Sequence, residues 1–294
     1  LWEKSRSISS VEEHHQNWVN EMKKSSIAYV PEKANEQHYE VPPAFFENAL
    51  GKHLKYSSGY WPDGIDTLDD SELAMLKLSS ERAELSDGID ILELGCGWGS
   101  LTLYMAENYP KSHITAVSNS KDQRIFIEKK CQERGFENVK VITADMNEFT
   151  IDDKFERIVS VEMFEHMRNY EQLLDKVSSW LKPQGKLFIH IFTHKTLVYP
   201  FTEDGEGDWM GRNFFSGGIM PSHQLLLYFQ KKLSIEESWR FNGSHYEKTS
   251  LAWLNKIDSN KDEILAIFGE TYGEENAPVW FQRWRIFFMA CEVL

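Results

Sequence analysis

Short apolar runs alternate with amphipathic stretches through the middle of the chain, from about residue 71 to residue 193. Apolar positions recur at helical spacing in SELAMLKLSSERAEL, LTLYMAENY, DQRIFIEKKCQERG and YEQLLDKVSSWLKP. The runs near and between them read as strands: IDILELG, HITAVSN, VKVITAD, RIVSVEMF and KLFIHIFTH. Continuous apolar strands that alternate with helices are typical of a parallel sheet covered on both faces. We therefore predict an α/β core over residues 71–193.

The segment before this core has a different pattern. Residues 11–28 are charged and helix-permissive, and a short aromatic helix is expected after Pro42 and Pro43. We interpret residues 1–70 as an N-terminal helical cap that covers the cofactor and the substrate.

The segment after the core breaks the alternation. Residues 194–232 are rich in aromatic residues, Gly and Pro, and an insertion of this kind after a fifth strand is interpreted as a lid. LSIEESWRF, at 233–241, is predicted to be a sixth strand. Residues 233–294 are therefore expected to supply this strand and the C-terminal helices that complete the core and the pocket.

Composition narrows the classes of partner. Hydrophobic residues make up 41% of the 294 residues, enough for one large core with an appended cap. The chain has 32 Lys and Arg residues against 46 Asp and Glu residues, a net charge of −14. An acidic protein disfavours phosphate backbones and anionic membrane surfaces and favours cationic ligands. We expect no nucleic-acid partner.

Cysteine usage and hydropathy bear on the setting. The three cysteines, at 96, 131 and 291, are widely spaced without a CxxC pair, so neither a disulfide framework nor a zinc site is indicated. No apolar run approaches the roughly 20 residues that cross a bilayer, and the first residues contain no signal-peptide core. We expect a cytoplasmic protein without stable membrane insertion. Because the chain does not begin with Met, a preceding targeting sequence stays an open question.

Three glycines in ELGCGWGS carry the first chemical signal. Gly95, Gly97 and Gly99 follow a strand and precede a helix, where the absence of Cβ atoms lets backbone N–H groups approach a bound group. A purely structural turn is the alternative. A dinucleotide site would add an acid at the end of the second strand, which here ends in Val-Ser-Asn. The sequence therefore disfavours NAD.

The E-x-G-x-G-x-G pattern that begins at Glu93 resembles the S-adenosylmethionine (SAM) motif of class I methyltransferases, which have a Rossmann-like sheet. ADMNEF, after the third strand, resembles their adenine-binding acidic turn at Asp145. The resemblance implies SAM as the cofactor and S-adenosylhomocysteine (SAH) as its product.

Further motifs narrow the resemblance and cover nearly the whole chain. HYEVPPAFFENALGKHLKYSSGYW, ITAVSNSKDQ, VSVEMFEHM and HYEKTSLAW occur in the order seen in the cyclopropane-fatty-acid-synthase superfamily. EMFEHM, HKT at 194–196, GGIMPSHQLLLYFQ and NGSHY resemble its coclaurine N-methyltransferase branch, which methylates alkaloid amines. Sheets of this class have seven strands and the family's chain continues into one more strand, whereas six strands are counted here.

The resemblance also implies roles for individual residues at the cofactor. The methionine end of SAM would meet Tyr56 and Ser57, and its backbone would lie on the motif of Glu93, Gly95 and Gly97. The ribose would meet Asn119 and Gln123 after the second strand, and the adenine would meet Asp145 and Met146 after the third. Without the family, Asn119 and Gln123 are equally well explained as polar residues that begin a helix.

Methylation of a basic amine requires a base, because an ammonium with a pKa of roughly 10 has no free lone pair. Glu162, Glu165 and His166 follow the fourth strand, at the sheet edge where such folds bind ligands, with the spacing i, i+3, i+4. If this turn is helical, the three side chains share one face. The carboxylates would attract the ammonium, and His166, near its ordinary pKa, would accept the proton. The alternative is a helix N-terminus with ordinary polar packing.

The substrate is expected to be a small, flat, aromatic amine. Lid and tail aromatics could enclose it, together with polar pocket residues: Tyr199, Phe201, Trp209, Phe214, His194, Tyr246 and Trp284. The histidines have no metal-ligand spacing, so no metal is expected. A homodimer is left open.

Two other functions compete. Cyclopropane-fatty-acid synthases resemble the chain, but they typically carry Cys at the position of Ser58 and a small residue at the position of Glu162. A non-catalytic SAM-binding regulator is the second alternative, and the intact cluster of Glu162, Glu165 and His166 speaks against it.

Overall fold

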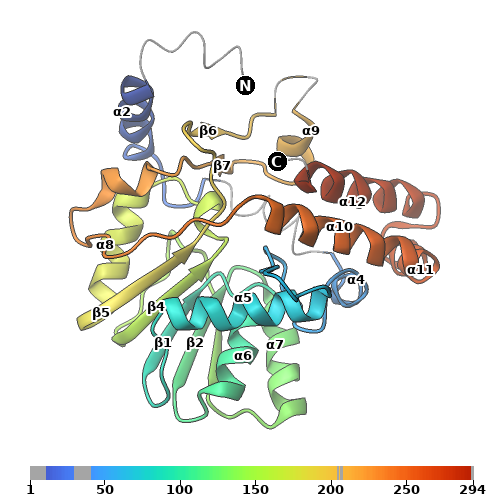
Figure 1. Cartoon of the computed structure of the whole chain (residues 1–294), viewed down its shortest axis with the longest axis horizontal. Helices are drawn as coiled ribbons and strands as arrows, with labels where there is room; N and C mark the ends of the chain where they lie inside the picture. Colours follow the sequence, from blue (N-terminus) through green and yellow to red (C-terminus); the bar gives the residue numbers. More distant parts are fainter. Residues whose placement is uncertain (1–10, 30–40, 204, 206–207, 293–294) are drawn as a thin grey trace.

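A five-stranded parallel sheet has the strand order β3-β2-β1-β4-β5. It forms the lower left part of the molecule in Figure 1. The structure is a computed structural model that describes residues 11–29, 41–203, 205 and 208–292. The strands span Asp90–Leu94 (β1), His113–Ser118 (β2), Val139–Thr143 (β3), Phe155–Val161 (β4) and Leu181–His190 (β5). The five core strands predicted from the sequence are confirmed.

Helices cover both faces of this sheet. They span Leu68–Arg82 (α5), Ser100–Asn108 (α6) and Lys121–Arg134 (α7) on one face, and Tyr170–Trp180 (α8) on the other (Figure 1). Successive residues of β1 show the two layers, because side chains alternate along a strand. Ile91 belongs to the apolar cluster with α5 and α6, whereas Leu92 belongs to the cluster with α8.

The helix ends follow the polar signals of the sequence. The Asn169 side chain accepts the Gln172 N–H at 3.0 Å and begins α8. Ser120 caps the start of α7, where its Oγ accepts the Gln123 N–H, and Gly135, with φ +69°, caps its end. A left-handed glycine closes a helix at low steric cost. These caps set where each helix enters and leaves the sheet edge that carries the site.

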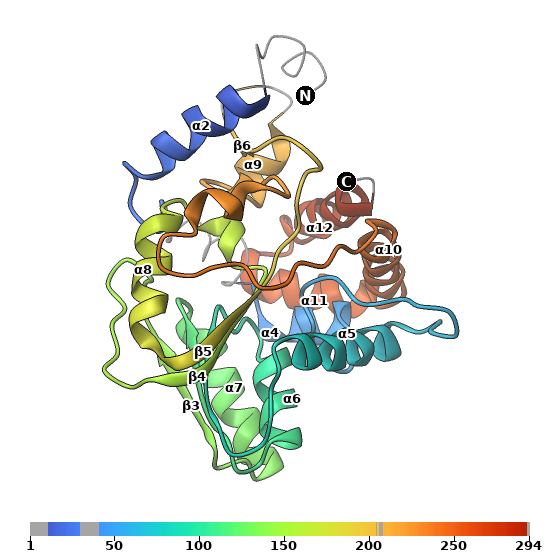
Figure 2. The same ribbon diagram turned by 60° about the vertical axis from the view of Figure 1, so that its left-hand side comes forward.

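A second, aromatic core joins the short helix after Pro42 to the C-terminal helices. It is built from Pro43–Ala49 (α4), Ser244–Ser259 (α10), Lys261–Tyr272 (α11) and Ala277–Glu292 (α12), which lie together in Figure 2. Phe45 and Trp284 pack with ring centroids 4.5 Å apart, and both are fully buried. This cluster fixes the helices beside the sheet edge.

The segment expected to be a lid has structure of its own. It contains a small antiparallel sheet, Tyr199–Pro200 (β6) with Ile219–Met220 (β7), the helix Trp209–Asn213 (α9) and the 3-10 helix Leu225–Phe229 (η3). The helix Val11–Met22 (α2) packs on it, where His15 Nε2 and Ser222 Oγ are 2.6 Å apart in a buried hydrogen bond. Residues 1–10 and 30–40 of the expected cap lie outside the described residues.

The prediction of a sixth strand at residues 233–241 is wrong. Residues 233–241 have no regular secondary structure and pair with no strand in the described chain. Ile235 and Trp239 are each 41% exposed, so the alternating pattern of LSIEESWRF does not cover a sheet face. The guanidinium of Arg82 instead lies 4.8 Å and 4.5 Å from the rings of Trp239 and Phe241. No helix in the part of the chain that the structure describes is long and apolar enough to span a membrane.

Candidate active site

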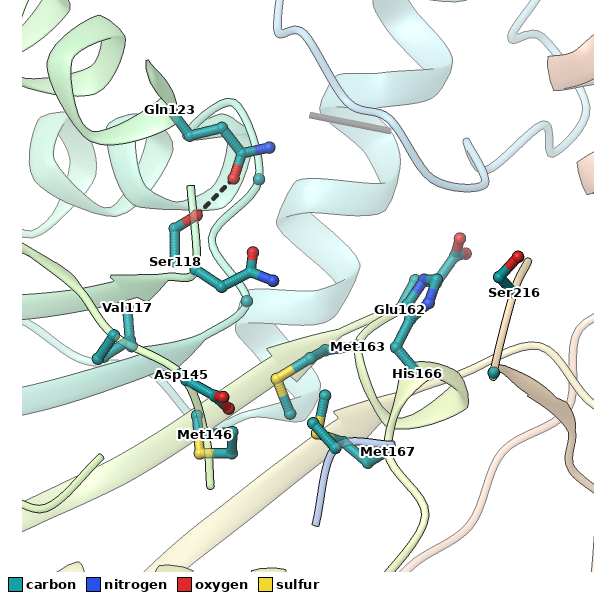
Figure 3. Close-up of a pocket in the computed structure, with 16 residues that line it drawn as sticks. Val117, Ser118, Gln123, Asp145, Met146, Glu162, Met163, His166, Met167 and Ser216 are labelled. Atoms are coloured by element: carbon teal, nitrogen blue, oxygen red, sulfur yellow. Dashed lines mark hydrogen bonds between the residues drawn. The ribbon is translucent and has the colours of Figure 1, made fainter. Parts of the chain in front are cut away.

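A cavity opens at the carboxyl ends of the strands, where open α/β sheets bind ligands. Successive strands each contribute to its lining: Gly95 and Gly97 after β1, Val117, Ser118 and Asn119 at the end of β2, Asp145 and Met146 after β3, and Glu162, Met163 and His166 after β4 (Figure 3). We call this the cofactor cavity. Ala28 and Ser216 approach it from the two flanking segments.

The glycine turn gives this cavity its floor. Gly95 has φ +79°, and a Cβ there would lie 2.8 Å from the Cβ of Met163, so no larger residue fits between β1 and the turn after β4. Gly97 has φ +52°, and a Cβ there would meet no atom within 4 Å. The open space in front of Gly97 is therefore available to a ligand.

Gln123 supplies a directed donor to the same cavity. Its Oε1 accepts the Ser118 hydroxyl at 2.6 Å, and the bond is drawn in Figure 3. With the carbonyl oxygen held, the amide nitrogen Nε2 is buried and has no hydrogen-bond partner among the residues described. A buried donor without a partner is costly and indicates that a ligand oxygen completes it.

Asp145 lies at the other end of the cavity. Its Oδ1 accepts the Asn147 N–H at 2.8 Å, which fixes the turn after β3. Asn147 in turn exchanges two hydrogen bonds with the backbone of Ala28, at 3.0 and 3.1 Å. The N-terminal segment is thereby fastened against this end of the site.

Glu162 has the most constrained position. Its backbone is left-handed, with φ +50°, although it is not glycine. The Glu162 N–H donates to the His190 carbonyl at 2.8 Å, and its two carboxylate oxygens accept the Ser58 N–H at 3.2 Å and the Tyr246 hydroxyl at 3.0 Å. Strain of this kind is concentrated at functional positions. Burial raises the pKa of Glu162, while the charge of Lys55 and the two donors oppose the rise.

Glu162 also lines a second, larger cavity of about 1260 Å³, which extends along the free edge of β5. The lining of this cavity includes three polar residues that lie within 4 Å of the Glu162 carboxylate and three aromatic residues whose rings contact one another: Ser58, His190, Tyr246, Phe192, Phe201 and Phe215. We call this part the aromatic pocket. The Glu162 carboxylate therefore stands between the cofactor cavity and the aromatic pocket.

His166 lies in the 3-10 helix Phe164–His166 (η2), and its ring stacks on Phe215 with centroids 5.4 Å apart and planes 2° apart. It lines the cofactor cavity, as predicted from the sequence. The expectation of an ordinary pKa is wrong, because burial lowers the pKa of His166 to about 4. The imidazole is therefore neutral at physiological pH.

Glu165 is separated from its two neighbours. The 3-10 turn is tighter than an α-helix, and Glu165 is 1% exposed and lines neither cavity, unlike Glu162 and His166. The expectation that all three share one face is therefore wrong. Its Oε2 has no hydrogen-bond partner within the described chain, and burial, with the charge of Glu162, raises its pKa well above the usual range. A neutral Glu165 follows.

Comparison with known proteins identifies the group to which the chain is related. A family model for mycolic acid cyclopropane synthetase matches residues 29–293. The chain belongs to this family. It is 39% identical to (S)-coclaurine N-methyltransferase of Thalictrum flavum subsp. glaucum over 92% of this chain and 76% of that protein. It is 40% identical to pavine N-methyltransferase of the same plant over 86% of this chain and 72% of that protein.

A solved structure agrees with these relatives. Coclaurine N-methyltransferase bound to N-methylheliamine and SAH matches with a TM-score of 0.92 and 36% identity, over 96% of this chain and 82% of that one. The resemblance predicted from the motifs is thus confirmed, and with it the class I methyltransferase fold, the SAM cofactor and the enzyme class, a SAM-dependent N-methyltransferase.

Within this family fold, six of the nine residues expected at the cofactor line the cavity: Gly95, Gly97, Asn119, Gln123, Asp145 and Met146. The other three do not line it. Glu93 is 3% exposed beneath the glycine turn, where it accepts the Thr102 hydroxyl at 2.5 Å, and burial raises its pKa to about 8. Ser57 bonds to Lys55, and the Tyr56 ring packs on the aromatic core.

Of the residues expected at the substrate, Phe201 and Tyr246 line the aromatic pocket. Phe214 and Trp284 are 2% and 0% exposed and pack in the aromatic core. Trp209, Tyr199 and His194 do not line the pocket either, and His194 Nδ1 accepts the Leu197 N–H at 2.7 Å within the lid.

Sequence reasoning did not single out His190, Phe192 and Ser216, which line the two cavities. It also missed Lys55, which lines neither cavity but is buried beside them and bonds to Ser58. Phe192 and His190 follow or end β5, so the rule that ligands bind at carboxyl ends of strands could have found them. Nothing in the sequence pattern marks Lys55 as buried. In the described parts of the chain, no group of three or more His, Cys, Asp or Glu residues is arranged to hold a metal ion.

Proposed function

We propose that the chain transfers a methyl group from SAM to the nitrogen of a small, flat aromatic amine of the alkaloid type. One observation carries the proposal: the Glu162 carboxylate borders both the cofactor cavity and the aromatic pocket. An anion at this junction is placed to hold a cationic nitrogen beside the cofactor. The names of the relatives, which include coclaurine and pavine N-methyltransferases, support this class of substrate.

The residues around the cofactor cavity suit SAM. The Nε2 of Gln123, which has no partner among the residues that the structure describes, and the carboxylate of Asp145 offer a donor and an acceptor to ribose hydroxyls and adenine. The open space at Gly97 admits a chain of atoms close to the backbone. When bound, SAM supplies an electrophilic methyl group on a sulfonium.

The chain's own residues would prepare the nucleophile. Glu162 would bind the ammonium and take its proton onto a carboxylate oxygen, which leaves the lone pair on nitrogen. Tyr246 and Ser58 hold that carboxylate in one orientation through their hydrogen bonds. His166 is neutral at physiological pH and would act as a second proton acceptor on the cofactor side. Glu165, which is protonated and lines neither cavity, would support these two residues from behind.

The aromatic pocket would select the shape of the substrate. Phe201 and Phe215 lie with ring centroids 4.9 Å apart, and Phe192 meets Phe215 edge-on at 5.9 Å. Such a wall favours a flat apolar ring and attracts a cation. The proposal includes a division of the chain into four parts. Residues 71–193 form the core, and residues 1–70 act as a cap. Residues 194–232 act as a lid over the aromatic pocket, and residues 233–294 complete the core and the pocket. The cytoplasmic location and the homodimer stay predictions.

Cyclopropanation of lipid is the second candidate, because the family name includes it. That reaction uses a bound bicarbonate as its base, by the resemblance. Here the Ser58 N–H already donates to the Glu162 carboxylate, and a second anion beside that carboxylate would be repelled. The site therefore favours a cation.

Incubation with SAM and a panel of benzylisoquinoline-type amines, followed by mass spectrometry, tests the proposal. We expect a gain of one methyl on the amine and formation of SAH. A lipid panel run in parallel should stay unchanged. Cyclopropanated lipid without amine product would support the second candidate, and SAM binding without turnover of either panel would support a regulator.

A further inference from the structure

A buried lysine lies next to the proposed site without belonging to it. Lys55, in the loop between α4 and α5, is 3% exposed, which is rare for lysine. Its Nζ donates to the Ser57 hydroxyl and to the Ser58 carbonyl, the latter at 2.9 Å. The side chain therefore binds the same short stretch that reaches Glu162.

The loop is shaped to bring this lysine inside. The carboxylate of Glu72, on α5, accepts the backbone N–H groups of Gly51, His53 and Lys55, at 2.9, 2.8 and 3.3 Å. A Cβ on Gly51 would lie 2.6 Å from Glu72 Oε2. Leu54, in the middle of the loop, has the left-handed φ of +51°. The three hydrogen bonds to Glu72 and the close packing at Gly51 together fix the position of Lys55.

Ser58 connects the lysine with the carboxylate. Its carbonyl accepts from Lys55 Nζ, and its N–H donates to Glu162 Oε1 at 3.2 Å. A shift of the loop would therefore move both bonds together. Burial lowers the pKa of Lys55 to about 8, which leaves it mostly cationic at neutral pH, and the charges of Glu162 and Glu72 oppose that lowering.

Other titratable groups face Glu162 from four elements: His190 on β5, Glu165 on η2, Tyr246 on α10 and Cys291 on α12. His190 Nε2 lies 3.9 Å from Glu162 Oε1, but burial lowers its pKa to about 3, so it is neutral. Burial raises the pKa of Glu165, Tyr246 and Cys291, which keeps them neutral as well. Lys55 is therefore the cation that faces Glu162 in this group.

We propose that Lys55 is a positioning residue of the reaction, whose buried ammonium keeps Glu162 ionised and holds the Ser58 amide on it, so that Glu162 binds the cationic amine. The inference rests on the proposed function. A buried carboxylate without a nearby cation takes up a proton instead of staying charged, and an uncharged Glu162 would no longer attract an ammonium. The lysine itself touches neither the amine nor the cofactor.

The test uses a cation that cannot lose a proton, so that its own titration does not enter. The probe is an N,N-dimethyl tetrahydroisoquinolinium, whose binding to the SAH complex is measured by calorimetry from pH 5 to pH 9. In the wild type, affinity should fall as the pH drops and Glu162 becomes protonated. In Lys55→Met, the midpoint of that fall should move up by at least about one pH unit, which corresponds to roughly tenfold weaker binding on its acid side.

Three controls separate charge from folding. Lys52→Met removes an exposed lysine from the same loop and should leave the midpoint unchanged. Lys55→Gln keeps a hydrogen-bond donor for the Ser58 carbonyl but removes the charge, so it should shift the midpoint in the same direction as Lys55→Met. It serves as the test variant if Lys55→Met does not fold. SAH affinity should stay the same in all three variants, because none lies on the cofactor cavity.

Two results would overturn the inference in distinguishable ways. A pH-dependent wild type with an unmoved midpoint in Lys55→Gln would refute the role of Lys55 and leave the proposed function standing. A wild type that does not bind the quaternary cation at any pH would refute the proposed function and, with it, the inference.

Discussion

Glu162 is the residue on which the proposed chemistry depends most. Its strained backbone and its two donors hold one carboxylate at the junction of the two cavities. We expect Glu162→Gln to lower kcat/KM for the amine by roughly 10²- to 10⁴-fold, the usual contribution of a general base, while the Kd for SAH changes little. Steady-state kinetics and calorimetry check this. The exposed Glu148→Gln, near Asp145 on the same sheet edge, is the matched control; a parallel loss of SAH affinity in Glu162→Gln would contradict the division of roles.

Gln123 offers a prediction for the cofactor side. Its Nε2 has no hydrogen-bond partner among the described residues, and Gln123 lines the cavity. We therefore expect an oxygen of bound SAH to accept a hydrogen bond from this nitrogen. Gln123→Met should weaken SAH binding by roughly 2- to 10-fold, the value of one neutral hydrogen bond. Titration of SAH by calorimetry measures the effect, and thermal melts with and without SAH should show a smaller ligand-induced rise in Tm. Unchanged affinity would mean that this nitrogen faces water instead.

At the scale of the element, the β1–α6 turn contains two glycines with opposite requirements. A Cβ on Gly99, the first residue before α6, would lie 2.7 Å from Cγ1 of Ile127, whereas one on Gly97 would meet nothing within 4 Å. Gly99→Ala should therefore lower the free energy of unfolding by about 1–3 kcal/mol through overpacking and left-handed strain. In an Ile127→Ala background, which lacks Cγ1, urea denaturation should show a smaller cost for Gly99→Ala. An equal cost of Gly99→Ala in both backgrounds would contradict the packing argument.

Gly97→Ala should behave differently, because its Cβ enters open space in the cofactor cavity. Its stability should fall by only about 1 kcal/mol, from the backbone conformation alone. Its SAH affinity should fall more than that of Gly99→Ala. Calorimetric Kd values for the two variants, measured beside their unfolding curves, give the comparison, and a reversed order of SAH affinities would contradict the assignment of the cavity.

Elements with strong local signals could be predicted from the sequence. The five buried strands and the helices between them follow from apolar continuity and helical spacing. LSIEESWRF has the alternation of a strand, but a strand also needs a neighbour to pair with, and pairing is decided in three dimensions. The two-residue strands of the lid are too short to leave any periodic pattern.

The site was predictable to the extent that it lies at the ends of strands. Gly95, Asn119, Asp145 and Glu162 follow consecutive strands, so the parallel topology brings them together. Burial of single side chains was not predictable. Trp284 and Phe214 are as aromatic as Phe201, yet only packing places them in the core, and the low pKa of His166 follows from burial that no local pattern announces.

At the scale of the whole molecule, buried carboxyl groups make stability depend on pH. Burial raises the pKa of Glu93 from 4.5 to about 8. Below pH 4.5 the folded and unfolded states both hold this proton, and the stability that it contributes is fully present. Above pH 4.5 the unfolded state releases this proton while the folded state still holds it, so the free energy of unfolding falls as the pH rises. The loss is complete once the pH has passed about 8, where the folded state releases the proton as well. The stability difference between wild type and Glu93→Gln should therefore shift against the wild type from pH 5 to pH 8. Urea denaturation at the two pH values measures it, and an equal difference at both would contradict the buried, protonated state.

The arrangement of the two cavities around one carboxylate is the central claim, and a crystal structure with SAH and the quaternary amine tests it most directly. The account predicts that the cationic nitrogen lies within about 4 Å of a Glu162 oxygen, the usual reach of an ion pair, with its rings against Phe201 and Phe215. A nitrogen bound elsewhere, with Glu162 facing only protein, would contradict it.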